Sequence, residues 1–94
     1  MPERKNEMIE RNIELSAEFS RYLFDHPDLE DSIPSDAEII FLPEFDSELK
    51  NFNLGVGKEL ESAGKKVVYV KIERIRPKVI SRIEGVSLNL HVSP

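Results

Sequence analysis

The stretch from residue 37 to residue 72 constrains the fold more than any other part of this sequence. Residues 37–43 (AEIIFLP) form a short apolar run that ends in proline, which is typical of a buried strand. Residues 46–63 have the apolar spacing of a helix that ends at Gly64, and residues 66–72 (KVVYVKI) are rich in β-branched side chains. A strand, a helix and a strand joined by short links form a βαβ unit, so we expect parallel strands with a right-handed crossover.

The residues before this unit predict one long helix, from about residue 3 to residue 25. Its apolar positions cover nearly half of the circumference at 100° per residue. These positions are Met8, Ile9, Ile13, Leu15, Phe19, Tyr22 and Leu23. So broad an arc predicts two packing partners: the sheet, and either another helix or a second subunit. Pro27 stops this helix, and residues 28–33 predict one further helical turn.

Two amides lie on or beside the apolar faces of the expected helices. Asn12 falls in the middle of the first arc, and Asn53 lies beside the apolar face of helix 46–63. A buried amide without a partner costs on the order of 1–3 kcal/mol. We therefore expect the two to meet, or each to bond backbone, between the helices. Gly55 and Gly57 each cost roughly 1 kcal/mol inside a helix, and we expect a close approach of the first helix backbone to compensate.

The charge of the chain changes sign towards its end. Residues 1–64 carry 16 acidic and 6 basic side chains, a net charge of −10, whereas residues 65–94 carry 7 basic and 2 acidic, a net charge of +5. The acidic chain as a whole argues against bulk nucleic-acid binding, but its basic end leaves open a patch for nucleic acid or for an acidic partner. We expect the basic end to pack along the acidic helices, within one chain or across a dimer.

The C-terminal arm, residues 74–94, is first basic and then alternately apolar and polar. Val86, Leu88, Leu90 and Val92 have the period of two that predicts a half-buried strand. Glu84-Gly85 predicts a tight turn that pairs this strand with residues 79–83. The arm either pairs with its own sheet or crosses to another subunit. We favour crossing, because residues 71–82 would then lie against an acidic helix of the partner.

Length and composition indicate a single α/β domain, residues 1–94, with a body of residues 1–73. A chain of 94 residues buries only roughly 60–68% of its unfolded surface, so the core is thin. The absence of cysteine excludes disulfides and Cys-ligated zinc and fits a reducing cytoplasm. No apolar run approaches a membrane span, and the N-terminus is too polar for a signal peptide. The expected fold is an N-terminal helix, a parallel βαβ unit and a C-terminal strand or hairpin.

The carboxyl ends of the two strands are the first place to look for a ligand site, because open parallel sheets bind ligands there. Glu44 and Asp46 follow the first strand, and Arg74 and Arg76 follow the second. Together they are candidate ligand-binding residues, and Glu44 with Asp46 could hold a hard cation or act as acid and base. The alternative, which we favour, is that Asp46 caps the helix and that an acid forms a salt bridge to Arg74 or Arg76.

No motif for catalysis, a cofactor or a metal ion stands out elsewhere. His26 and His91 each lack a second histidine at ligand spacing. Residues 55–58 (GVGK) lie inside a helix and lack the spacing of a phosphate-binding loop. Catalytic residues are therefore unknown, no cofactor or metal is predicted, and an enzyme is the less favoured class.

Several short segments, taken in order, resemble a family of small prokaryotic proteins of unknown function. They are 12–15 (NIEL), 19–23 (FSRYL), 26–29 (HPDL), 33–34 (IP), 42–43 (LP), 53–54 (NL) and 64–68 (GKKVV). The resemblance covers about residues 5–73. It implies a cytoplasmic prokaryotic protein and brings no catalytic residues with it.

Three functions remain open from the sequence. The leading one is a non-enzymatic interaction module, either a homodimer or a subunit that binds another protein. The second is a small-ligand or hydrolytic site at the carboxyl ends of the strands. The third is a nucleic-acid-linked regulator, similar to an antitoxin, that uses the basic strip 71–82. None of the three involves a membrane.

Overall fold

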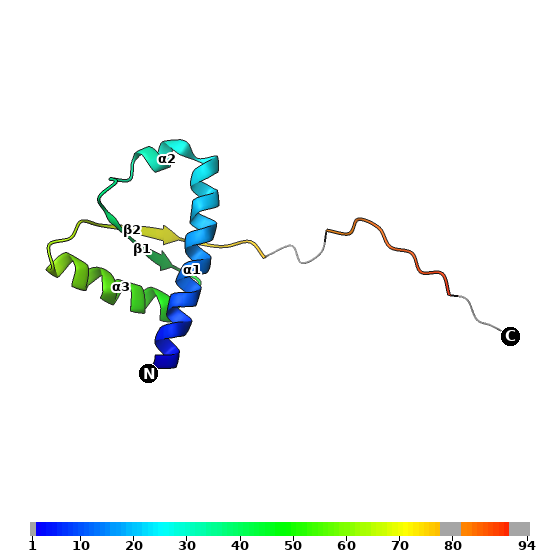
Figure 1. The fold of residues 1–94 in the computed structure, drawn as a ribbon, viewed down its shortest axis with the longest axis horizontal. Coiled ribbons are helices and arrows are strands. Elements are labelled where there is room, and N and C mark those ends of the chain that lie inside the picture. The colour runs from blue at the N-terminus through cyan, green and yellow to red at the C-terminus, as the bar shows by residue number, and fades with distance from the viewer. Residues whose placement is uncertain (1, 78–81, 91–94) are drawn as a thin grey trace.

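The structure, a computed structural model, describes residues 2–77 and 82–90. Its elements are α1 (Pro2–Asp25), α2 (Pro27–Asp31), β1 (Glu38–Pro43), α3 (Ser47–Ser62) and β2 (Val67–Ile72). Figure 1 shows these five elements as one body, with residues 82–90 leading away from it. The α/β class, the long first helix and the parallel βαβ unit are confirmed.

The ends of α3 follow from local chemistry. Asp46 is its N-cap and accepts a hydrogen bond from the Leu49 N–H at 3.2 Å, as the sequence predicts. At the other end Gly64 has a φ of +80°, a left-handed conformation that glycine adopts without steric cost. These two residues set the length of the crossover, and with it the place where β2 begins.

The hydrogen-bond register decides which backbone groups face outwards. Glu38 pairs with Val67 at one end of the sheet, and Pro43 pairs with Ile72 at the other. The Glu38 N–H donates to the Lys66 carbonyl at 2.8 Å. In a parallel strand, every second residue directs its backbone N–H and C=O towards the same neighbouring strand. In β1 and β2 these are the even-numbered residues, whose backbone groups point towards the other strand. The odd-numbered ones, which are 39, 41 and 43 in β1 and 67, 69 and 71 in β2, direct their backbone groups to the outer edges.

The core is small and lies where α1 and the start of α3 meet β1. Its buried members are Met8, Leu15, Phe41 and Leu49, with Phe19, Ile39, Phe52, Val70 and Ile72 half-buried around them. The ring of Phe19 packs edge-on against Phe41, with 5.5 Å between the ring centroids. No residue of β2 is fully buried, whereas β1 contributes three buried side chains. The two strands are thus unequally covered.

The expected close approach of the α1 backbone to the glycines of α3 is wrong. A Cβ added to Gly55 would meet no atom within 4 Å, so no backbone approaches there. A Cβ added to Gly57 would lie 2.6 Å from Cε1 and Oη of Tyr69, which belongs to β2 and not to α1. Gly57 therefore makes room for a tyrosine ring rather than for a helix backbone.

The C-terminal strand or hairpin does not form in the described residues of this single chain. Residues 82–90 contain neither helix nor strand, and Leu88 and Leu90 are 90% and 88% exposed. A strand forms in a sheet, and the sheet of the described residues consists of β1 and β2 alone. The expectations for Lys78, for residues 79–81, and for His91 and Val92 lie outside the described residues.

Candidate interaction surfaces

An asparagine pair covers one backbone carbonyl on the outer edge of β1. Nδ2 of Asn53 donates to the outward-facing carbonyl of Phe41 at 2.9 Å. The amides of Asn12 and Asn53 also bond reciprocally, at 2.9 and 2.8 Å. The predicted meeting of the two asparagines is therefore present, and one of them also bonds backbone. At the end of the same edge, Pro43 has no N–H to leave unpaired.

The outer edge of β2 carries no such cover. The sheet has two strands in the order β1-β2, so no strand lies beyond β2 in the described parts of the chain. The outward-facing backbone groups are those of Val67, Tyr69 and Lys71, and all the side chains of β2 are half-buried or exposed. Unpaired strand edges of this kind are templates for another strand.

Ion pairs link α1 to the N-terminal end of α3. Arg11 forms ion pairs with Asp46 at 3.4 Å and with Glu48 at 3.0 Å. Arg4 also pairs with Glu48, and Glu7 lies 3.6 Å from Arg11. The network explains why Asp46 is not available as a free carboxylate for a ligand.

No ion pair joins the four candidate ligand-binding residues to one another in the described parts of the chain. The Glu44 carboxylate pairs with Lys50 at 2.9 Å and with Lys71 at 3.8 Å. The hydrogen bond from Lys50, with the charges of Lys50 and Lys71, holds the pKa of Glu44 below its usual value. Arg74 and Arg76 are exposed, and neither forms an ion pair within the described residues. The acids thus pair with other cations than the sequence predicts.

The pairing of Glu44 with Lys71 could have been predicted from the strand register. Lys71 pairs with Leu42 across the sheet, two residues before Glu44, so the side chains of Lys71 and Glu44 project from the same face of the sheet. The pairing of Arg11 with Asp46 required the crossing of α1 over α3, for which the sequence holds no signal.

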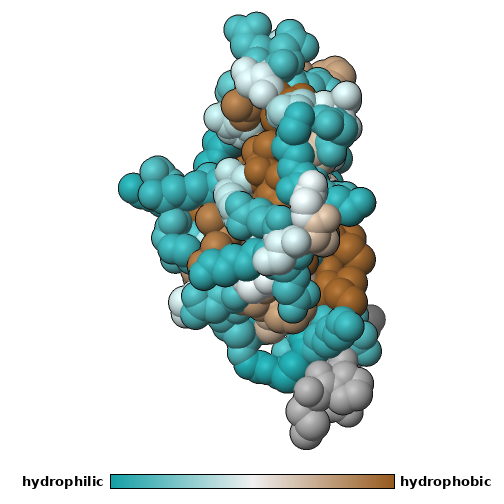
Figure 2. All heavy atoms as spheres, turned by 90° about the vertical axis from the view of Figure 1, so that its left-hand side faces the viewer, coloured by the Kyte–Doolittle hydropathy of each residue, from teal (hydrophilic) through white to brown (hydrophobic). Residues whose placement is uncertain are grey.

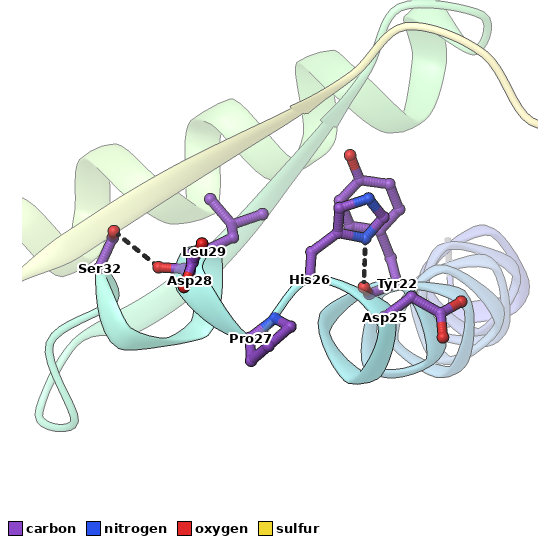
Figure 3. A pocket seen from close by; sticks show the side chains of 7 residues that line it. All are labelled: Tyr22, Asp25, His26, Pro27, Asp28, Leu29 and Ser32. Carbon is purple, nitrogen blue, oxygen red and sulfur yellow. Dashed lines mark hydrogen bonds between the residues drawn. The ribbon is translucent and has the colours of Figure 1, made fainter.

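A shallow hollow lies at the corner between α1 and α2. It has a volume of about 480 Å³ and is lined by Tyr22, Asp25, His26, Pro27, Asp28, Leu29 and Ser32. Figure 3 shows the His26 ring stacked on Tyr22, at 3.9 Å between centroids, with its Nδ1 pointing at the Tyr22 carbonyl 2.8 Å away. All the lining residues are exposed. Over residues 2–77 and 82–90, no three His, Cys, Asp or Glu side chains are grouped to hold a metal ion.

The side of α1 that faces away from the core is partly apolar. This outer face of α1 consists of Ile9, Ile13, Ala17, Ser20 and Phe24, which recur every three or four residues. Ile13 is 63% exposed and Phe24 is 86% exposed. Figure 2 shows another face of the molecule, where most of the surface is hydrophilic and apolar side chains show between the polar ones. The broad apolar arc of this helix is therefore only half used within one chain.

Comparison with known families places the chain. A family of unknown function (DUF5647) matches residues 7–86. The chain belongs to this family. No curated protein and no solved structure matched the sequence. Membership in DUF5647 agrees with the resemblance to a small family without an assigned function. None of the helices in the described residues is long and apolar enough to cross a membrane.

Proposed function

We propose that this member of DUF5647 is a non-enzymatic protein-interaction module that pairs with a second copy of itself through the outer face of α1. The observation that carries the proposal is the exposure of Ile13 and Phe24, at 63% and 86%, on a helix whose opposite side already packs on the core. Exposed apolar side chains that follow one face of a helix are typical of a surface that another helix covers.

A second copy fits this face because the face is complementary to itself. Two α1 helices that run antiparallel and cross near Ala17 bring Ile9 and Ile13 of one chain towards Phe24 of the other. Ala17 and Ser20 are small, so they let the two helices approach closely at the crossing. The same pairing places the exposed acids Glu10 and Glu14 near the end of the partner helix where Arg21 pairs with Glu18 at 2.6 Å.

The expected strength of this pairing is modest. Burying Ile13 and Phe24 of both chains is worth on the order of 6–12 kcal/mol, at roughly 1.5–3 kcal/mol for each side chain. Association itself costs an estimated 4–15 kcal/mol. Because the two quantities are similar, the dimer should form and dissociate within an accessible range of protein concentration.

Sedimentation velocity over a wide concentration range tests the proposal. The native chain should pass from monomer to dimer as its concentration rises, and its melting temperature should rise with it. Ile13→Glu should remain monomeric while its helical circular dichroism is unchanged. Phe45→Glu is the matched control, because Phe45 is 51% exposed but lies outside α1, and it should still dimerise. A native chain that is monomeric throughout, or an Ile13→Glu dimer, would overturn the proposal.

A further inference from the structure

We propose that the basic strip 71–82 binds the phosphate backbone of double-stranded nucleic acid. The inference goes beyond the homodimer proposed above and does not depend on it. The strip carries five basic side chains and one acidic side chain, a net charge of +4, whereas residues 1–64 have a net charge of −10. A basic segment attached to an acidic body is typical of an arm that binds a polyanion.

The arginines of the described residues fall into two groups. Arg4, Arg11 and Arg21 of α1 each form an ion pair with an acid of the same chain. Those of the arm are exposed and form no ion pair within the described residues; they are Arg74, Arg76 and Arg82. A guanidinium group binds a phosphate through two parallel hydrogen bonds. The arm therefore presents the cations that suit phosphate, and the acids of the body leave them available.

The acids nearest to the strip in the sequence do not neutralise these arginines. Glu73 precedes Arg74 and Glu84 follows Arg82, and both acids are exposed without an ion pair in the part of the chain that the structure describes. Lys71 already pairs with Glu44, at 3.8 Å. The positive charge that remains for a partner is thus carried by the arginines.

The form of the strip favours nucleic acid over an acidic protein. Residues 73–77 and 82–90 contain neither helix nor strand, and Figure 1 shows this part of the chain leading away from the body. Cations along such a segment meet the evenly spaced phosphates of a nucleic acid in any register. The carboxylates of a folded protein lie at fixed positions instead, and complementary recognition requires cations held at matching positions.

The composition of the arm favours a duplex over a single strand. Residues 71–94 contain no phenylalanine, tyrosine or tryptophan, so no aromatic side chain there can stack on an unpaired base. The contacts are then limited to the backbone, and a duplex offers the denser charge, one for about every 1.7 Å of its axis. Salt screens the repulsion from the acidic helices over about 8 Å at physiological ionic strength. We expect binding that is independent of base sequence and depends steeply on salt.

Fluorescence anisotropy of the full chain with short labelled duplexes of DNA and of RNA tests the proposal. Three arginine–phosphate contacts predict a slope of about −2.7 for log K against log salt, at roughly −0.9 for each contact. Arg74→Gln combined with Arg76→Gln should reduce the slope to about −0.9 and weaken binding. Binding of either duplex supports the proposal, and the duplex that binds more tightly identifies the source of the phosphates.

The matched control combines Arg4→Gln with Arg21→Gln. It removes the same charge from arginines that are already paired within the chain, and the slope should stay near about −2.7. Equal losses in the two double variants would overturn the proposal, because net charge and not the strip would then decide binding. A native chain that binds neither duplex at low salt also overturns it.

Two further measurements separate this inference from its alternatives. An oligoglutamate peptide that carries the charge of the duplex should bind much more weakly; if it binds as tightly, the strip is a site for an acidic protein and the proposal is wrong. Ile13→Glu, the variant that tests the homodimer, should bind the duplex with an unchanged slope. Failure of the homodimer therefore leaves the binding of nucleic acid to be judged by its own data.

Discussion

The two outer edges of the sheet differ although the strands have the same length and a similar apolar character. At β1, the carbonyl of Phe41 is bonded by Asn53, which Asn12 holds in place from α1. At β2, the corresponding backbone groups of Tyr69 face away from every described element. An exposed edge invites pairing with another chain. The edge of β1 is thus bonded by a side chain at Phe41, whereas within the described residues the edge of β2 is not.

The difference follows from where the helices can reach. The crossover helix α3 and the long helix α1 meet on the β1 side, where the Asn12–Asn53 pair joins them. On the β2 side, α3 contacts Tyr69 through Gly57, which lies against the ring, and through Glu61, which accepts a hydrogen bond from Tyr69 Oη at 3.0 Å. The two helices thus supply a side-chain bond to the edge of β1, whereas no strand lies beyond β2 in the described residues.

Removing the Asn53 side chain should have the largest effect on stability. Asn53→Ala leaves both the Phe41 carbonyl and the Asn12 amide without a partner, and each unpaired buried group costs about 1–3 kcal/mol. Asn12→Ala should cost less, because Asn53 keeps its bond to Phe41. Urea denaturation of both single variants and the double variant gives a coupling energy, expected at about 0.5–3 kcal/mol. The control combines Asn53→Ala with the distant Lys66→Ala, whose changes in the free energy of unfolding should add. If the changes for Asn12→Ala and Asn53→Ala also add, the prediction is contradicted.

The sequence predicts the meeting of Asn12 and Asn53 but not the third member of the group. Helical periodicity places each amide at an apolar face, and two helices over one small sheet have to meet. The bond to Phe41 depends on whether odd or even residues of β1 face outwards. That choice is fixed by the pairing of Glu38 with Val67, which no local pattern in an all-apolar strand reveals.

Substitutions at the two glycines of α3 test how this helix packs against β2. Gly57→Ala puts a methyl group 2.6 Å from the Tyr69 ring, so the ring has to move and its bond to Glu61 is strained. We expect a loss of about 1–3 kcal/mol in the free energy of unfolding, as for other overpacked sites. Gly55→Ala is the matched control, since its Cβ meets nothing within 4 Å and it should gain about 1 kcal/mol from helix propensity. Equal changes at the two positions would refute the assigned contact.

The sequence did not predict the contacts of three regions: the glycines of α3, the carboxyl ends of the strands, and the arm. Spacing shows that Gly57 needs a close neighbour, but not that the neighbour is Tyr69. It also places Glu44 near cations, but the nearest are Lys50 and Lys71 and not Arg74 or Arg76. The alternation of Val86, Leu88 and Leu90 predicts a strand, yet a strand needs a second backbone, and a single sequence does not say which chain supplies it.

The smallest expected effect concerns Glu44, which joins the two strands at their common end. Its N–H donates to the Ile72 carbonyl at 2.9 Å, while its carboxylate pairs with Lys50 and Lys71. The bond from Lys50 and the two positive charges lower the pKa of Glu44 from 4.5, so the folded state favours the ionised form. The resulting stabilisation is present above about pH 4.5 and is lost as the pH falls through the lower pKa of the folded state.

Glu44→Gln should therefore lower the melting temperature slightly at about pH 7, and the difference from the native chain should shrink towards about pH 3, because Glu44 takes up a proton as the pH falls through its lowered pKa. Added salt should reduce the difference at about pH 7, because both partners lie at the surface. Glu14→Gln is the matched control, as Glu14 is exposed on α1 and has no ion pair within the described residues. If the Glu44→Gln difference is the same at both pH values, the lysines do not act through the charge of Glu44. The link between the ends of β1 and β2 would then rest on the backbone bond to Ile72 alone.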